Sequence, residues 1–196
     1  NEITHVEGSV DPVRDVELIH AELLLADYEM LESKLQHLEK VVRSDPNSTQ
    51  KLELETIRKA YEMAGRGRML SELELSDEEA VFIKQQAVLT YKPMLYVANV
   101  SEADNIEKNE DFIALSDFVG KERIISISAL FEKELLELNP EDREAFSDEF
   151  NSNNGGIQEL VKAGYLLLNL ITFYTLANNK LQAWQIPKGT KAPQAA

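Results

Sequence analysis

Apolar residues recur with a helical period through the early part of the chain. Asp11-Pro12 predicts the start of a helix, because the aspartate side chain can cap the first turn and proline suits its first position. Beyond it, apolar positions separated by alternating steps of four and three residues form one seam of a long helix: Leu24, Tyr28, Leu31, Leu35, Leu38 and Val42. Asp45-Pro46 predicts its end.

A second helical seam follows after a short connection. It comprises Leu54, Ile57, Tyr61 and Ala64, and Gly65 predicts its end. Two helices that each carry an apolar seam and are joined by a short connection predict an antiparallel helical hairpin. Ser76 and Glu79 then have the spacing of a capping box that opens another short helix.

The pattern changes at residue 92. Residues 92–98 are a continuous apolar run after a proline, which predicts a buried strand. Residues 109–119 have a helical pattern that ends at Gly120, and residues 123–128 predict a second strand. Strand, helix and strand in this order predict a βαβ unit with parallel pairing.

The remaining residues predict helices and then a β-hairpin. The segments are a helix over 130–150 broken near Asn139-Pro140, a loop over 151–156, a helix over 157–169, strands over 171–176 and 180–186, and a loop over 187–193. A lone hairpin is not a stable domain, so we expect more sequence to follow it. The absence of a starting methionine likewise leads us to expect a fragment.

Composition narrows the function classes. The chain has 35 acidic and 20 basic residues, a formal net charge of −15, which disfavours broad non-specific binding of nucleic acids or anionic membranes. It contains no cysteine, which excludes disulfides and thiolate metal sites and favours a reducing cytoplasm. The nearest approach to a membrane-spanning run, Tyr165 to Leu170, is far too short to span a bilayer.

The most informative candidate site is the loop that follows the first predicted strand. Open α/β sheets bind ligands at the carboxyl ends of their strands. Asn99 could offer both a donor and an acceptor to a base edge there, and Glu102 could accept from an amine. The second strand leads into Ser128-Ala129, whose backbone could approach the same base. The alternative is an ordinary strand-ending turn, in which asparagine is common.

Segments spread along the whole chain resemble the YchF/Obg-like ATPases. They are Ile3-Thr4-His5-Val6, Val10 to Glu17, Lys92-Pro93-Met94, Tyr96 to Glu102, Lys162 to Tyr165, Ala183-Trp184 and Gly189 to Ala196. The resemblance implies an α/β fold: part of a P-loop NTPase domain with a Rossmann-like parallel sheet, interrupted by an antiparallel helical coiled-coil hairpin, and the start of a β-grasp (TGS) domain. It places the NTPase portion at 1–22 and 92–169, the helical insertion at 23–91 and the TGS portion at 170–196.

The resemblance also implies a base-binding site for ATP rather than GTP. GTP-using relatives carry Asn-Lys-x-Asp, whose aspartate pairs with two guanine donors, whereas this chain has Val100 and Glu102 at those positions. Asn99 would contact the base edge, Val100 would pack beside it, and Glu102 would help to reject guanine. Ser128 and Ala129 would form the second base-contacting loop.

His5 is the candidate catalytic residue. The family has an apolar residue in place of the water-positioning glutamine of ordinary GTPases, so another group must orient the attacking water. A loop histidine can do so near neutral pH, although His5 could equally be a structural residue of its loop. We expect His20 and His37, which lie in helical segments, to be surface residues.

The phosphate-binding motif is absent from the sequence. Gly120-Lys121 is the only Gly-Lys pair, and Glu122 follows it where serine or threonine is required. By the resemblance, the phosphate loop and the Mg²⁺ ligands precede Asn1, no metal ligand is assigned here, and the rest of the TGS domain follows Ala196. We therefore expect the intact protein to be an ATPase and this chain alone to be inactive.

Two other function classes stay open. In one, the helical hairpin and the TGS portion form a non-enzymatic module that binds a protein partner. In the other, Trp184, Lys188 and Lys191 contact RNA, in line with the ribosome association of the family. No membrane partner is expected.

Overall fold

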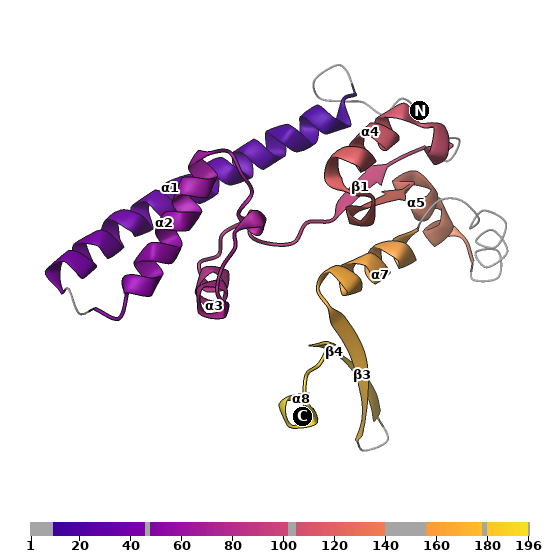
Figure 1. The fold of residues 1–196 in the computed structure, drawn as a ribbon. Coiled ribbons are helices and arrows are strands. Elements are labelled where there is room, and N and C mark those ends of the chain that lie inside the picture. The colour runs from indigo at the N-terminus through magenta and orange to yellow at the C-terminus, as the bar shows by residue number, and fades with distance from the viewer. Residues whose placement is uncertain (1–9, 46–47, 102–104, 140–155, 178–179, 196) are drawn as a thin grey trace. The chain divides into compact units, whose positions relative to one another are not determined.

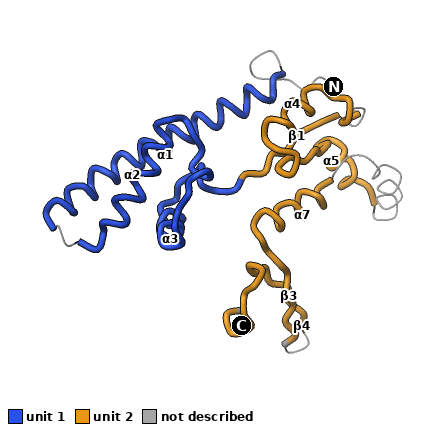
Figure 2. The backbone as a smooth tube through the Cα atoms, in the orientation of Figure 1, with its two compact units in different colours: residues 1–93 blue, residues 94–196 orange. Residues whose placement is uncertain are grey.

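The computed structural model describes residues 10–45, 48–101, 105–139, 156–177 and 180–195 (Figure 1). They fall into two compact units, residues 1–93 and 94–196 (Figure 2). Unit 1 contains α1 (Pro12–Ser44), α2 (Lys51–Gly65), the 3-10 helix η1 (Leu70–Glu72) and α3 (Asp77–Gln85). Unit 2 contains β1 (Tyr96–Asn99), η2 (Ile106–Lys108), α4 (Glu110–Val119), η3 (Lys121–Arg123), β2 (Ile124–Ile127), α5 (Ala129–Glu137), α7 (Ile157–Leu167), β3 (Leu170–Ala177), β4 (Lys180–Pro187) and α8 (Ala192–Ala195).

In unit 1, α1 and α2 form the predicted helical hairpin (Figure 1). The predicted ends of α1 are confirmed: Asp11 Oδ1 accepts from the Arg14 N–H at 3.0 Å, and the helix ends before Asp45. The two seams meet in a core whose buried apolar members are Leu24, Leu31, Leu38, Leu54, Ile57, Ala60, Ala64, Leu70, Ile83 and Val88. Apolar burial along this seam is the main stabilisation of the hairpin.

Tyr28 and Tyr61 join the helices within the same seam. Their rings stack with centroids 4.5 Å apart, and their hydroxyl groups lie 2.6 Å apart in a hydrogen bond. This bond is the largest cause that raises the pKa of Tyr61 to about 12. Gly65 permits the close packing, since a Cβ there would lie 3.2 Å from the Tyr28 ring.

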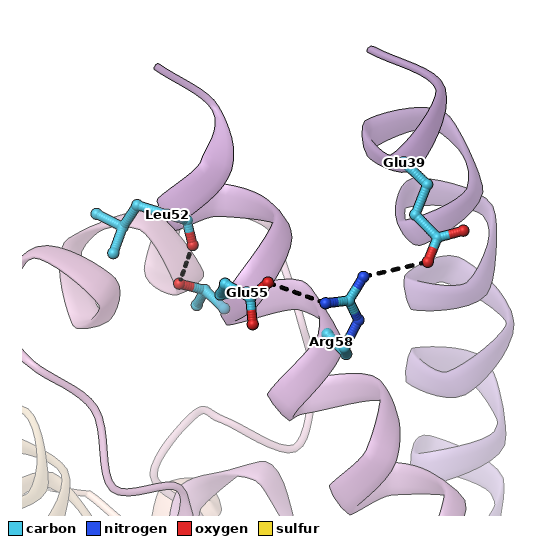
Figure 3. Close-up of polar contacts among 5 residues, drawn as sticks. Glu39, Leu52, Glu55 and Arg58 are labelled. Carbon is cyan, nitrogen blue, oxygen red and sulfur yellow. Dashed lines mark hydrogen bonds and ion pairs between the residues drawn. The ribbon is translucent and has the colours of Figure 1, made fainter. Parts of the chain in front are cut away.

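Surface ion pairs flank the hairpin seam. Arg58 of α2 contacts Glu55 on its own helix at 2.9 Å and Glu39 on α1 at 3.3 Å (Figure 3). Within α2, the Thr56 hydroxyl donates to the Leu52 carbonyl at 2.7 Å. Because the charged groups are solvent-exposed, each pair contributes at most about 1 kcal/mol.

The segment after α3 returns to α1 through a buried carboxylate. Asp27, only 2% exposed, accepts from the Leu89 N–H at 2.7 Å and from the Thr90 N–H at 2.8 Å. The Thr90 hydroxyl donates to the same carboxylate at 2.6 Å. These bonds anchor an irregular segment to the middle of α1.

In unit 2, β1 and β2 pair in parallel with α4 between them in sequence, which confirms the predicted βαβ unit. β1 is shorter than the predicted strand over 92–98. Pro93 has no N–H to offer a ladder, and the pairing begins only at Tyr96, opposite Ile124. α4 is capped by the Asn109 side chain and ends at Gly120, whose φ of +95° favours glycine.

The later elements of unit 2 follow the predicted order. α5 ends at Glu137, next to the predicted break, while residues 140–155 lie outside the described part. α7 continues into the antiparallel β3–β4 hairpin, in which Phe173 faces Trp184. Both strands of this hairpin are edge strands, and apolar side chains such as Tyr174 and Leu181 are largely exposed.

The predicted domain boundaries relate differently to these elements. The boundary between residues 22 and 23 lies inside the continuous helix α1, and the boundary between residues 91 and 92 lies two residues before the division between the units. The division at residue 170 falls at the start of β3 within unit 2. The assignment of 170–196 to a TGS domain stays a prediction.

Candidate functional site: two strand ends that meet at Asn99 and Ala129

The candidate site lies where β1 and β2 end. Parallel pairing brings the carboxyl ends of both strands to one edge, and the last pair in register is Asn99 and Ile127. The Val100 N–H donates to the Ile127 carbonyl at 3.0 Å, which holds the chain one residue beyond β1. Both following loops therefore start from fixed positions.

A side-chain hydrogen bond joins the two loops. Asn99 Oδ1 accepts from the Ala129 N–H at 3.1 Å, across 30 positions in sequence. A backbone N–H can only donate, so the oxygen of the Asn99 amide must face Ala129 and its Nδ2 must face another direction. Both residues are solvent-exposed. The sequence predicted that these residues lie together, but not that they bond to each other.

Ser128 connects the end of β2 to α5, because it is the N-cap residue of that helix. Its side chain is 5% exposed, and its Oγ accepts from the Phe131 N–H at 3.3 Å, as expected for the residue that caps α5. Its carbonyl accepts from the Glu132 N–H. The hydroxyl is therefore engaged in capping, and the exposed face of this loop is that of Ala129.

Val100 is buried, with 9% of its surface exposed, and packs within the protein directly after β1. An aliphatic residue suits this place, since a lysine would have to bring its ammonium out to solvent. Farther from the strand ends, burial raises the pKa of Tyr96 on β1, and the Arg123 charge opposes that shift.

Two of the predicted site residues lie outside the described part of the chain. Glu102 follows the β1 loop and His5 belongs to the N-terminal segment, and neither is described. The structure thus brings together Asn99, Val100, Ser128 and Ala129. The other histidines belong to unit 1, where His37 is exposed and partial burial lowers the pKa of His20.

The Asn99 amide offers a hydrogen-bond donor at the ends of β1 and β2. Its Oδ1 is held by the Ala129 N–H, which leaves Nδ2 to donate to a ring nitrogen or another acceptor. No cluster of three or more potential metal ligands is found among the described residues. Within the same residues, no helix has the length and apolarity to cross a membrane.

Known proteins match this chain over nearly its whole length. The Ribosome-binding ATPase YchF of Bacillus subtilis is 35% identical over 198 residues, which cover 99% of this chain and 54% of that protein. The human Obg-like ATPase 1 is 37% identical over 203 residues, covering 100% of this chain and 51% of that protein. A solved structure described as the Schizosaccharomyces pombe YchF GTPase superposes with a TM-score of 0.83 at 32% identity, over 99% of this chain and 54% of that one.

This chain belongs to the YchF/Obg-like family. It spans about half the length of the curated relatives that it matches. No protein-family model matches it. The likeness to the YchF structure confirms the predicted α/β fold of a partial P-loop NTPase.

Proposed function

We propose that the chain supplies the base-recognition loops of an ATP-binding and ATP-hydrolysing switch protein that associates with the ribosome. The observation that carries this proposal is the Asn99–Ala129 hydrogen bond, which holds two strand-end loops together at the usual ligand edge of an α/β sheet. Relatives whose names read "Ribosome-binding ATPase YchF" and "Obg-like ATPase" support the nucleotide and the partner.

Adenine is the base that we assign to this site. The aspartate of an Asn-Lys-x-Asp motif accepts hydrogen bonds from the N1–H and the 2-amino group of guanine. Adenine lacks both of these donors. With Val100 and Glu102 in this motif, the loop lacks the lysine and carries a longer carboxylate. The names of the relatives differ in the nucleotide that they give, since the Schizosaccharomyces pombe structure is described as a GTPase. Direct comparison of the nucleotides is therefore the decisive measurement.

The remaining chemistry is assigned outside these loops. A nucleotide bound here needs phosphate contacts and Mg²⁺, for which this chain has no Gly-x-x-x-x-Gly-Lys-Ser/Thr motif. We propose that the intact protein supplies them, that His5 helps to orient the attacking water, and that the isolated chain does not hydrolyse ATP.

The test is to titrate ATP and GTP, with Mg²⁺, into the whole protein and two Asn99 variants. Asn99→Asp keeps an oxygen that can accept from the Ala129 N–H but removes the Nδ2 donor, whereas Asn99→Ala removes both. Loss of one base hydrogen bond weakens ATP binding by about tenfold in either variant. Gln158→Ala, which removes an exposed amide from α7, is the matched control and leaves affinity unchanged.

The outcomes separate three parts of the proposal: the adenine assignment, the Asn99 contact and the nucleotide site itself. Tighter binding of GTP than of ATP would overturn the adenine assignment alone. Wild-type affinity in Asn99→Asp would remove Asn99 from the base contact. Binding of neither nucleotide to the wild type would reject the nucleotide site.

One observation favours a second function beside this one. All the apolar core residues of unit 1 lie between Leu24 and Val88, so the helical hairpin has a core of its own. Such a unit can present a surface to a protein or RNA partner independently of nucleotide. In that case residues 10–93 alone retain partner binding, and Asn99→Ala leaves it unchanged.

A further inference from the structure

One hydrogen bond joins α5 to α7 outside the two loops around Asn99 and Ala129, which we call the base loops. Glu132 lies one turn into α5, and its Oε1 accepts from the Ile157 N–H at 3.1 Å. Ile157 is the first residue of α7, and its N-cap residue, Gly156, provides no side-chain cap. Glu132 therefore caps α7 from another helix, where a carboxylate also complements the positive end of the helix dipole.

Gly156 makes this contact possible. A Cβ at Gly156 would overlap Glu132 Oε1, so any other residue there would push the carboxylate away. The Gly156 backbone, with φ of −100°, lies in a region that all residues can adopt. Glycine is therefore favoured here because Glu132 comes so close, and not because of the backbone conformation.

The same N-terminal turn of α5 also carries a contact of the base loops. Ala129 is the first residue of α5, and its N–H donates to Asn99 Oδ1. Glu132 stands three residues later, less than one helical turn away. A shift of Asn99 or Ala129 on ligand binding thus moves the turn of α5 that carries Glu132.

α7 is in turn bound to the β3–β4 hairpin. The Tyr165 hydroxyl lies 3.3 Å from Thr172 Oγ1 of β3. The Lys188 N–H, directly after β4, donates to the Asn169 carbonyl at 2.7 Å. Asn169 has a φ of +51° and turns the chain from α7 into β3. Movement of α7 is therefore passed to the hairpin through hydrogen bonds at both of its strands.

We propose that Glu132 is a positioning residue that couples the state of the base loops to α7 and the β3–β4 hairpin. The inference rests on the proposed function, since it requires a nucleotide at Asn99 and Ala129. It identifies the hairpin as the part of unit 2 that responds to that nucleotide.

The experiment is hydrogen–deuterium exchange of the whole protein with and without saturating ATP and Mg²⁺. In the wild type, nucleotide changes amide exchange in the first turn of α7 and in the hairpin by about fivefold or more. Glu132→Ala and Gly156→Ala, which break the same contact from its two sides, both lose most of that change while ATP still binds. Glu132→Gln keeps an oxygen acceptor for the Ile157 N–H and retains it.

Glu134→Ala is the control, because this exposed residue lies on the same helix and has no such contact. It keeps the full response. The coupling is overturned if ATP binds but Glu132→Ala responds as the wild type does, or if ATP leaves wild-type exchange in α7 unchanged. In both cases the measured affinity leaves the nucleotide site intact. If the wild type binds no nucleotide, the proposed function fails first and the coupling fails with it.

Discussion

At the scale of single residues, Asp27 holds the segment after α3 against α1. It is buried, and its carboxylate accepts two backbone N–H groups and one hydroxyl from a segment 62 and 63 positions away. Removing such an acceptor leaves buried donors without partners, which costs more than the bonds themselves contribute. The residue therefore decides whether the segment after α3 stays docked on α1.

Asp27→Ala is expected to lower the free energy of unfolding by about 3 kcal/mol, because two N–H groups lose their acceptor. Urea unfolding followed by circular dichroism measures the change. Glu29→Ala, at an exposed position on the same helix, is the control and changes stability by no more than about 0.5 kcal/mol. Equal stability of the two variants would show that the docked segment finds other partners.

At the scale of elements, the Glu79 carboxylate stabilises α3 in two ways. Glu79 completes the capping box with Ser76 and also accepts from Lys59 of α2 at 2.6 Å. The bond from Lys59 and that from the Ser76 N–H lower the pKa of Glu79 below its ordinary value of 4.5. The ionised form is favoured by folding, so its stabilisation is present above pH 4.5 and is lost as the pH falls through the lowered pKa.

Glu79→Gln tests this linkage. The variant is expected to be less stable than the wild type at about pH 6, and the difference shrinks towards about pH 3, because the wild-type carboxyl takes up its proton as the pH falls through its lowered pKa. Chemical unfolding at both pH values gives the difference. Glu78→Gln, exposed and adjacent, shows little difference at either pH. A gap that stays constant with pH would contradict the role of ionisation.

Elements are also the scale at which the sequence was most informative. Local signals predicted the Asp11 and Ser76 caps, the heptad seam of α1 and the order of the βαβ unit, because each depends on residues within a few positions. The apolar run at 92–98 predicted too early a start for β1, since strand length is set by the partner, which begins at Ile124.

The candidate site was predictable in place but not in detail. The sequence put Asn99 at the end of the first predicted strand and Ala129 just after the second, and the structure places them there. The bond between them, and that between Glu132 and Ile157, depend on the exact geometry of segments 30 and 25 positions apart. Asp27 carried no signal either, since an aspartate on a helix is normally a surface residue.

At the scale of the whole molecule, the two units differ in how complete their packing is. Unit 1 gathers ten buried apolar side chains in one core within residues 10–93, whereas the buried apolar residues described in unit 2 are fewer: Val100, Leu115, Ile124 and Ile127. A unit with its own core can fold alone, while a two-stranded sheet needs further packing.

We expect residues 10–93, expressed alone, to unfold in one cooperative thermal transition. A shorter fragment of residues 10–75 lacks α3 and leaves Asp27 without Leu89 and Thr90, so it melts at a lower temperature or without a transition. Circular dichroism of both fragments makes the comparison. Identical melting of the two would show that the α1–α2 seam alone accounts for the stability of unit 1.

The hydrogen bond between Asn99 and Ala129 also bears on how a ligand would be captured. Because the Ala129 N–H holds Asn99 Oδ1, the protein itself sets the orientation of the amide. Less side-chain entropy is then lost on binding, so even one or two contacts to the purine can give useful affinity.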